Sequence, residues 1–232
     1  MDELIGGETT RLLLLVKPAG IPVFPPHAVP EGDCLLARLR LARPEQAVGP
    51  WPDGYDGGLA HRLDTATSGA VLAARTPDDL AWLRGLFAGR ALVKTYRFVS
   101  ARDVPWDSHV VTTALAHDAR RKDRMIAQRG ADTPHRGRWY PAETRLRRLG
   151  RLGGLGIWEA RMKSGVMHQI RAHAASVGLA LAGDAIYGGG PPPDLTGRPE
   201  DAPFLLHHLG VAGPDLPPLP PLPPPAWWPR SP

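Results

Sequence analysis

The chain has 232 residues, of which 43% are hydrophobic and 22% charged, a composition typical of a soluble globular protein with a sizeable core. The apolar run Leu12–Val16 has five residues, too few for a membrane span or a signal-peptide core. Cys34 is the only cysteine, which excludes an internal disulfide and a cysteine-based zinc cluster. We therefore expect a cytoplasmic protein.

The net charge is +5, and the positive charge is concentrated in one segment. Residues 119–151 hold eleven basic side chains against three acidic ones, a local net charge of +8. This basic segment favours a polyanionic partner. The same count also fits a solvated face in a chain that uses arginine in place of lysine. On charge alone, both interpretations stay open.

The first predicted element is the strand Thr10–Val16, which a Pro/Gly turn closes. A helix is expected to follow and to run to about Arg43, with Asp33 as its N-cap and Pro44 at its end. Gly69–Ala74, with the sequence GAVLAA, is typical of a buried strand.

A second helix is expected after Thr76, whose hydroxyl can cap it, with Pro77 in its first turn and Gly89 at its end. Leu92–Val99 predicts a strand in which alternate side chains face opposite ways. Gly156–Met162 is the next predicted strand. These elements follow one another without a regular strand–helix–strand rhythm.

The helical spacing of Ile170, Ala174 and Val177 predicts a last helix over residues 168–177, ended by Gly178. The order of elements favours an α+β fold with a mixed, mainly antiparallel central sheet and flanking helices. We expect one catalytic domain over residues 1–232, with its core at about residues 10–212.

The C-terminal segment is rich in proline. Residues 214–229 read PDLPPLPPLPPPAWWP, and a polyproline helix would align Leu216, Leu219 and Leu222 in one stripe. The segment could bind a proline-recognition domain, or it could lay its leucines on the body of the protein. We favour the second interpretation, a strap over residues 213–232.

Few familiar catalytic signatures are present. The phosphate-binding loop, the GxGxxG loop and the HExxH motif are absent. His168 and His173 are five residues apart, which does not give a shared metal-binding face on a helix. Asp64, Tyr96 and Arg171 remain as candidates. Each of them, taken alone, has an ordinary structural explanation.

Several segments together resemble the RluA-type pseudouridine synthase family. The closest is HRLDTATSG at residues 61–69, which is similar to the family's HRLDxxTSG box. The others, in the family's order, are VKPAGIPV (16–23), KTYRFV (94–99), PAETRLR (141–147), HQIRAHAASVG (168–178), GDAIYG (183–188) and LLHHLGV (205–211). The resemblance covers most of the chain, from about residue 12 to residue 211.

The resemblance implies an isomerase that converts uridine in ribosomal or transfer RNA to pseudouridine. It also implies a central RNA-binding cleft in the sheet. In this reaction uracil is cut from its ribose, turned, and rejoined through C5, which needs neither a metal nor a cofactor. We expect an RNA partner, no membrane association and a monomer.

The resemblance also assigns residue roles. Asp64 is implied as the catalytic carboxylate, acting as nucleophile or base on the sugar. Arg171 is implied to pair with Asp64, Tyr96 to lie against the uracil, and Arg62 to enter the RNA stack where the uridine leaves. The remaining implied contacts to substrate or RNA are His61, Thr67, Lys94, His168 and Gln169.

Two departures from the family pattern leave alternatives open. Val166 stands where the family usually has a basic residue, and an N-terminal S4 RNA-binding domain is not expected before the first strand. A family-like RNA-binding protein without catalysis is therefore one alternative. An aspartate-dependent hydrolase is another, and it would need a second acid, for which Asp184 is the candidate.

Overall fold

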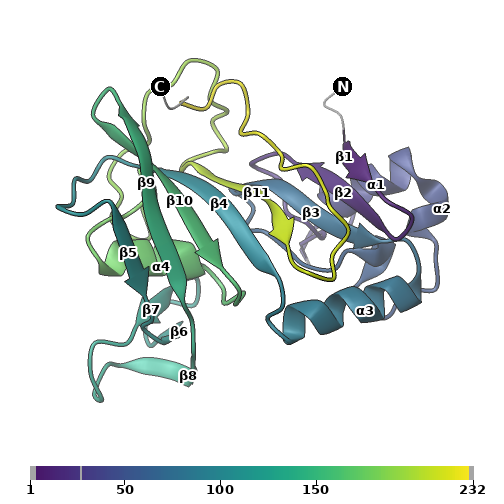
Figure 1. The fold of residues 1–232 in the computed structure, drawn as a ribbon, viewed down its shortest axis with the longest axis horizontal. Coiled ribbons are helices and arrows are strands. Elements are labelled where there is room, and N and C mark those ends of the chain that lie inside the picture. The colour runs from purple at the N-terminus through teal and green to yellow at the C-terminus, as the bar shows by residue number, and fades with distance from the viewer. Residues whose placement is uncertain (1–3, 27, 230–232) are drawn as a thin grey trace. The chain divides into compact units, whose positions relative to one another are not determined.

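The computed structural model describes residues 4–26 and 28–229 (Figure 1). The helices are α1 (Leu35–Ala42), α2 (Pro44–Ala47), α3 (Pro77–Ala88) and α4 (Gln169–Ser176), with a 3-10 turn, η1, at Asp56–Gly58. The strands are β1 (Ile5–Glu8), β2 (Leu12–Lys17), β3 (Ser68–Ala74), β4 (Val93–Ser100), β5 (Ser108–Val111), β6 (Leu115–Asp118), β7 (Met125–Ala127), β8 (His135–Tyr140), β9 (Thr144–Leu152), β10 (Leu155–Met162) and β11 (Leu206–Ala212).

The described chain divides into two compact units. The first unit contains the residues up to Lys94, together with Pro199–Ala202 and His207–Pro224. The second unit contains Thr95–Arg198, Pro203–Leu206 and the residues from Pro225 onward. Each unit has its own hydrophobic cluster and is described by itself below.

The first unit is built on strands in the order β1-β2-β3-β11. β2 pairs with β1 and β3 in antiparallel orientation, whereas β11 runs parallel to β3. Nearly all of β2 and all of β3 is buried, because their sequences LLLLVK and SGAVLAA are apolar almost throughout. Leu80 and Leu83 of α3 join the same core as Leu14 and Leu72.

The second unit contains strands in the order β4-β10-β9-β5 and a separate sheet in the order β7-β6-β8. β9 and β10 form a long antiparallel hairpin, and β5 and the strands of the small sheet also pair in antiparallel orientation. α4 contacts β7 and β9. The predicted α+β class, mixed and mainly antiparallel, is confirmed.

The predicted strands and helices are present, with ends shifted by one or two residues, but the predicted cap of α1 is wrong. Cys34, in an extended conformation, precedes the helix, and its sulfur accepts a hydrogen bond from Ala37 N at 3.3 Å. The Asp33 carboxylate pairs instead with Arg38 at 2.7 Å on the surface. The last helix is shorter than predicted because His168 adopts a left-handed conformation at φ 51°.

The proline-rich segment packs on the body of the protein. Leu216 and Leu222 are buried in the core of the first unit, and Leu219 packs against it. Leu222 N–H donates to Leu209 C=O at 2.7 Å. Trp228 is 4% exposed in a cluster of the second unit. Residues 230–232 of the expected strap lie outside the described residues.

Candidate active site

The first unit holds the loop around Asp64, which joins η1 to β3. Thr67 N–H donates to Asp64 C=O at 3.0 Å, which closes the turn that the sequence predicts. Leu63 is 6% exposed and anchors the loop in the core, whereas Arg62 is exposed and Asp64 half-buried. The loop therefore fixes the backbone from which Arg62 and Asp64 extend.

Lys17, at the end of β2, holds this loop from inside the protein. Its side chain is fully buried, and its Nζ donates to the carbonyl oxygens of Pro18, Ile21 and Thr65 at 2.8, 2.6 and 3.0 Å. Burial lowers the pKa of Lys17 to about 7, and the negative charge of Asp64 opposes that shift. The sequence analysis gave Lys17 no role, although the VKPAGIPV segment contains it.

His61 is an anchor of the same loop. Its Nε2 accepts a hydrogen bond from Leu72 N at 3.1 Å, and its ring lies 5.3 Å from that of Phe87. Burial, then the nearby His208 and Lys94, hold the pKa of His61 well below its ordinary value. An imidazole bonded in this way to the protein backbone positions the loop, and the implied contact of His61 to RNA stays a prediction.

Gly69 follows the loop at the point where β3 and β11 pair. Its φ of +118° favours glycine, and a Cβ at this position would collide with the backbone of His208. The glycine of the TSG sequence is therefore required by the close approach of two strands.

Thr67 and Lys94, also implied as substrate or RNA contacts, are buried in the first unit at 2% and 7% exposure. The Thr67 hydroxyl has no hydrogen-bond partner among the described residues. Burial lowers the pKa of Lys94 to about 8, and its Nζ lies 5.8 Å from the centre of the Phe87 ring. Their contact to RNA stays a prediction.

The second unit holds Arg171 in the first turn of α4. Its Nε donates to Asp184 Oδ2 at 2.6 Å and its Nη2 to Asp184 Oδ1 at 3.0 Å, a bidentate pair in which both side chains are at most 5% exposed. The guanidinium also lies over the rings of Tyr187 and Phe204, at 5.2 and 4.4 Å. Three groups of the protein, one carboxylate and two aromatic rings, thus fix one orientation of this cation.

Asp184 is held by the tight turn of the GDAIYG segment. Its N–H donates to Leu181 C=O, and its own carbonyl accepts from Tyr187 N and Gly189 N. A Cβ at position 189 would collide with the Leu181 carbonyl, so the turn needs glycine there. Because Asp184 is engaged with Arg171, the structure does not support it as the second acid of a hydrolase.

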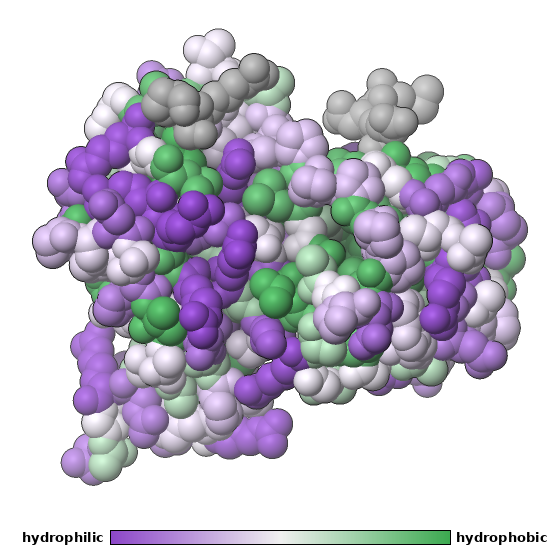
Figure 2. Space-filling view, viewed as in Figure 1, coloured by the Kyte–Doolittle hydropathy of each residue, from purple (hydrophilic) through white to green (hydrophobic). Residues whose placement is uncertain are grey.

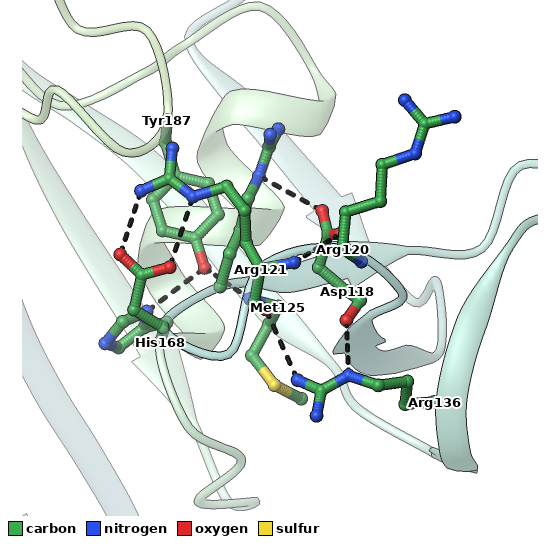
Figure 3. Close-up of polar contacts among 9 residues, drawn as sticks. Asp118, Arg120, Arg121, Met125, Arg136, His168 and Tyr187 are labelled. Carbon is green, nitrogen blue, oxygen red and sulfur yellow. Dashed lines mark hydrogen bonds and ion pairs between the residues drawn. The ribbon is translucent and has the colours of Figure 1, made fainter.

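Tyr187 connects α4 to the small sheet (Figure 3). Its hydroxyl accepts from Met125 N at 2.9 Å and lies 3.1 Å from His168 Nδ1. Since the hydroxyl has one proton, it can donate that proton to His168 Nδ1 and leave Nε2 as the donor nitrogen of the ring. His168 is thus oriented by Tyr187, a residue that the sequence analysis did not single out.

Gln169, the first residue of α4, is buried and takes part in a network of hydrogen bonds. Its Nε2 donates to Glu143 C=O and Thr144 Oγ1 at 2.9 and 3.0 Å, and its Oε1 accepts from Ser164 Oγ and Val166 N. Both ends of the amide are therefore occupied within the protein. This arrangement lets Gln169 position the start of α4, and its implied contact to RNA stays a prediction.

The second unit also contains Tyr96, a predicted site residue, and Val166, which departs from the family pattern. Tyr96 is 5% exposed on β4, on the same buried face as Phe98, as the predicted alternation requires. Val166, at the departure from the family pattern, packs against the cluster that contains Ala172 and Tyr187. Val166 is thus a half-buried apolar side chain where the family usually has a basic one.

The basic segment divides into two parts. On β9, Arg145 pairs with Glu143, and Arg147 with Glu159. Figure 2 shows hydrophilic side chains gathered over β9 and β10. In and around the small sheet, five exposed basic side chains form no ion pair with a described residue; they are Arg120, Lys122, Arg129, Arg136 and Arg138. Uncompensated positive charge therefore gathers at the small sheet.

The structure brings the predicted residues together in two groups. His61, Arg62, Asp64 and Thr67 share one loop of the first unit, with Lys94 near His61. The second unit contains a further set, formed by Tyr96, His168, Gln169 and Arg171. The implied pair between Asp64 and Arg171 joins residues of different units and stays a prediction.

Among the described residues, no group of three or more His, Cys, Asp or Glu side chains is arranged to hold a metal ion. In the same part of the chain, every helix is too short or too polar to cross a bilayer. His61, Gln169 and Arg171 are engaged by hydrogen bonds or an ion pair within their own unit.

Comparison with known proteins gives a consistent set of relatives. The family described as RNA pseudouridylate synthase matches residues 11–176, which include the Asp64 loop, β4 and α4. Ribosomal large subunit pseudouridine synthase D of Zymomonas mobilis is 29% identical over 181 residues, 78% of this chain and 54% of that protein. An uncharacterized RNA pseudouridine synthase of Chloroflexus aurantiacus is 32% identical over 173 residues, 74% of this chain and 50% of that protein.

The chain spans about half the length of these curated relatives. Among solved structures, human RNA pseudouridylate synthase domain containing 1 has a similar fold, with a TM-score of 0.68 and 19% sequence identity. The match covers 90% of this chain and 78% of the human one.

Proposed function

This chain belongs to the RNA pseudouridylate synthase family, and we propose that it converts uridine in RNA to pseudouridine. In this reaction the bond from ribose to N1 of uracil breaks and a bond from ribose to C5 forms. The C5 hydrogen leaves as a proton and N1 gains one, so substrate and product are isomers and no oxidant is needed. The observation that carries the proposal is the family match over residues 11–176.

We assign the catalytic carboxylate to Asp64. Its loop is tied to the core by Leu63 and, through the Thr65 carbonyl, by Lys17, while the Asp64 side chain itself is only half-buried. A carboxylate fixed in this way can attack the sugar or remove a proton from it, which are the two routes to glycosidic cleavage open to a single acidic group.

Arg171 is proposed as the cation that stabilises the negative charge of Asp64. The support is its family position together with its rigidity, because Asp184 holds Nε and Nη2 at 2.6 and 3.0 Å. Asp184 is then a positioning residue, which acts on the reaction through Arg171. A cation fixed in advance costs no reorganisation when charge develops during the reaction.

Tyr96 is proposed to contact the uracil, and Arg62 is proposed to take the place of the flipped uridine in the RNA. Tyr96 would lie against the detached uracil and hold it between cleavage and rejoining. Arg62 is exposed, and its planar guanidinium can stack in the RNA where the uridine has left. Such stacking offsets part of the few kcal/mol that base flipping costs.

We propose ribosomal RNA as the first substrate to test, since relatives such as that of Zymomonas mobilis are named for the large ribosomal subunit. Transfer RNA is the second. Exposed cations of the small sheet, Arg120, Lys122 and Arg129, support backbone contact to either RNA. We further propose a monomer in the cytoplasm, which light scattering and cell fractionation test.

The test of the proposed function is conversion of uridine in purified ribosomal and transfer RNA, measured by nucleoside mass spectrometry after chemical tagging of pseudouridine. The wild-type protein should form pseudouridine at defined positions. Asp64→Asn should lower the rate at least about 10³-fold, because it removes the reacting group while keeping the size of the side chain. Asp53→Asn, at an exposed carboxylate, is the matched control.

RNA binding is measured beside catalysis. Asp64→Asn should keep its affinity for RNA within about twofold, since phosphate contacts supply most of the binding. Normal turnover by Asp64→Asn contradicts the assignment of the carboxylate. Absence of pseudouridine with every RNA tested, although the wild-type protein binds RNA, contradicts the proposed activity.

A further inference from the structure

A cavity of about 710 Å³ lies in the second unit beside Tyr187, beyond the residues assigned to the reaction. One wall is α4, another is β7 with the loop that follows it. The volume is in the range of about 300–1,000 Å³ that is typical of pockets for small ligands. A nucleotide therefore fits by size.

The floor of the cavity is apolar. Ala172 and Ala175 lie three residues apart on one face of α4, and their small side chains leave the space open. Met125, Ala127 and the ring of Tyr187 belong to the same lining and to one hydrophobic cluster with the two alanines. A flat, apolar surface with an aromatic ring is the kind of surface on which a nucleobase stacks.

The rim of the cavity carries more positive than negative charge. Arg120, Arg124 and Arg129 line it together with Asp118 and Asp132. Arg120 and Arg129 are exposed and form no ion pair with a described residue, whereas Asp118 lies beside Arg124. Arg124 lies over the Tyr187 ring at 5.7 Å, and its Nε is 3.9 Å from Asp118 Oδ2. That Nε is buried and makes no hydrogen bond with a described residue.

The outer wall is held in place by local hydrogen bonds. Thr133 Oγ1 accepts from Arg129 N and Gly130 N at 3.0 Å each. On the other side, Asp118 Oδ1 accepts from Arg120 N at 2.8 Å, which fixes the start of the adjoining loop (Figure 3). The cavity is thus bounded by short, internally bonded loops that carry the arginines.

We propose that this cavity binds a second, unstacked nucleotide of the RNA substrate, with its base on the alanine floor and its phosphate at the arginine rim. The inference rests on the proposed function, because it takes RNA as the partner. An acidic peptide could satisfy the arginines but would need an aromatic side chain beside its acidic ones to cover the floor. Every nucleotide joins a planar base to a phosphate, so the combination of floor and rim favours a nucleotide. The site helps to select RNA by requiring an unpaired nucleotide in addition to the target uridine.

The first test fills the floor. Ala175→Leu takes up the space for the base, and Ala175→Ser is the matched control that leaves it open. The probes are an oligouridylate of about 12 nucleotides, within the ~4–16 nucleotide site size of single-strand binders, and an abasic oligomer of equal length. We expect Ala175→Leu to lower affinity for the oligouridylate about 5- to 100-fold and to leave affinity for the abasic oligomer unchanged.

The rim is tested separately with Arg129→Gln. This variant should weaken both probes equally and reduce the slope of log affinity against log salt by about 0.7, the value for one phosphate contact on a single strand. Equal losses for both probes in Ala175→Leu, or no loss for either, overturn the proposed base site. So does a polyaspartate that binds as tightly as the oligouridylate.

A measurement on the wild-type protein covers the case in which Ala175→Leu does not fold. An oligouridylate containing 4-thiouridine is irradiated with the protein, and crosslinked peptides are identified by mass spectrometry. Crosslinks within residues 118–134 or 172–187 are expected, because these segments line the cavity, and crosslinks confined to other segments overturn the inference. Pseudouridine formation is followed in the same preparation, so loss of the proposed activity is seen independently of the cavity.

Discussion

The two units hold their candidate catalytic charges in different ways. In the first unit, the Asp64 loop is held through its backbone, since the carbonyl oxygen of Thr65 accepts a hydrogen bond from Lys17. In the second unit, the guanidinium of Arg171 itself forms an ion pair with the Asp184 carboxylate. The Asp64 side chain is therefore half-buried, whereas the Arg171 side chain is buried and its guanidinium is held by direct hydrogen bonds.

This difference predicts how each part responds to mutation. A group held through backbone carbonyls tolerates changes in neighbouring side chains, provided that the donor to the carbonyl remains. A group held by a buried ion pair depends on both partners, because removing one leaves the other charge buried without compensation. Mutations in the two units should therefore differ in their cost to stability.

The largest effect is expected from Arg171→Met. This variant keeps an apolar stem but leaves the Asp184 carboxylate, 1% exposed, without its two hydrogen bonds. The free energy of unfolding should fall by about 3–5 kcal/mol in urea denaturation. The control is Arg38→Met, which breaks the exposed pair with Asp33 and should cost about 0–1 kcal/mol.

The double variant Arg171→Met, Asp184→Leu separates stability from catalysis. Removing both charges should restore most of the lost stability, since no unpaired buried charge remains. Pseudouridine formation should stay absent, because the cation proposed to act on Asp64 is gone. A double variant that regains turnover shows that Arg171 has a structural role only.

Lys17→Met should change the pH dependence of stability. The folded protein holds the pKa of Lys17 at about 7, below its ordinary 10.5, so between these values the unfolded chain binds the additional proton. The free energy of unfolding should therefore rise with pH in this range, and Lys94, with its pKa lowered to about 8, acts in the same direction. Lys17→Met should make this rise shallower.

The same variant also loses the hydrogen bond to Thr65 C=O, so stability at pH 7 should fall by about 1–3 kcal/mol. Lys163→Met, at an exposed lysine, is the control and should leave the pH profile unchanged. Parallel profiles for the wild-type protein and Lys17→Met are the result that contradicts this part of the account.

The smallest effect is expected from Thr65→Ala. The Thr65 side chain is exposed, and the loop is held through its carbonyl oxygen, which alanine retains. The free energy of unfolding should stay within about 0.5 kcal/mol of the wild-type value. A loss as large as that of Lys17→Met shows that the side chain, and not the backbone, holds the loop.

Local chemistry made part of the fold predictable from sequence. Thr76 caps α3 through its hydroxyl, Pro77 begins the helix, and Gly89 follows its last residue, as predicted. The strands β6, β7 and β8 were not predicted, because they are three to six residues long and partly exposed, with no apolar run to mark them. Their stability comes from pairing with one another, which sequence periodicity does not show.

Site residues could be predicted from the sequence only where they lie in a family motif. The HRLDTATSG segment directed attention to Asp64, and HQIRAH to Arg171. The ion pair of Arg171 with Asp184 joins residues 13 positions apart, and the hydrogen bond from Met125 N to Tyr187 joins residues 62 positions apart. Such contacts are set by tertiary packing, so spacing along the chain gives no signal for them.

The most direct measurement of the central claim is the release of tritium from RNA labelled at C5 of uridine. Formation of a bond from ribose to C5 displaces the hydrogen at that carbon into water. The account predicts one tritium released for each pseudouridine formed by the wild-type protein, and none with Asp64→Asn. RNA that binds the wild-type protein and keeps all of its tritium contradicts the account.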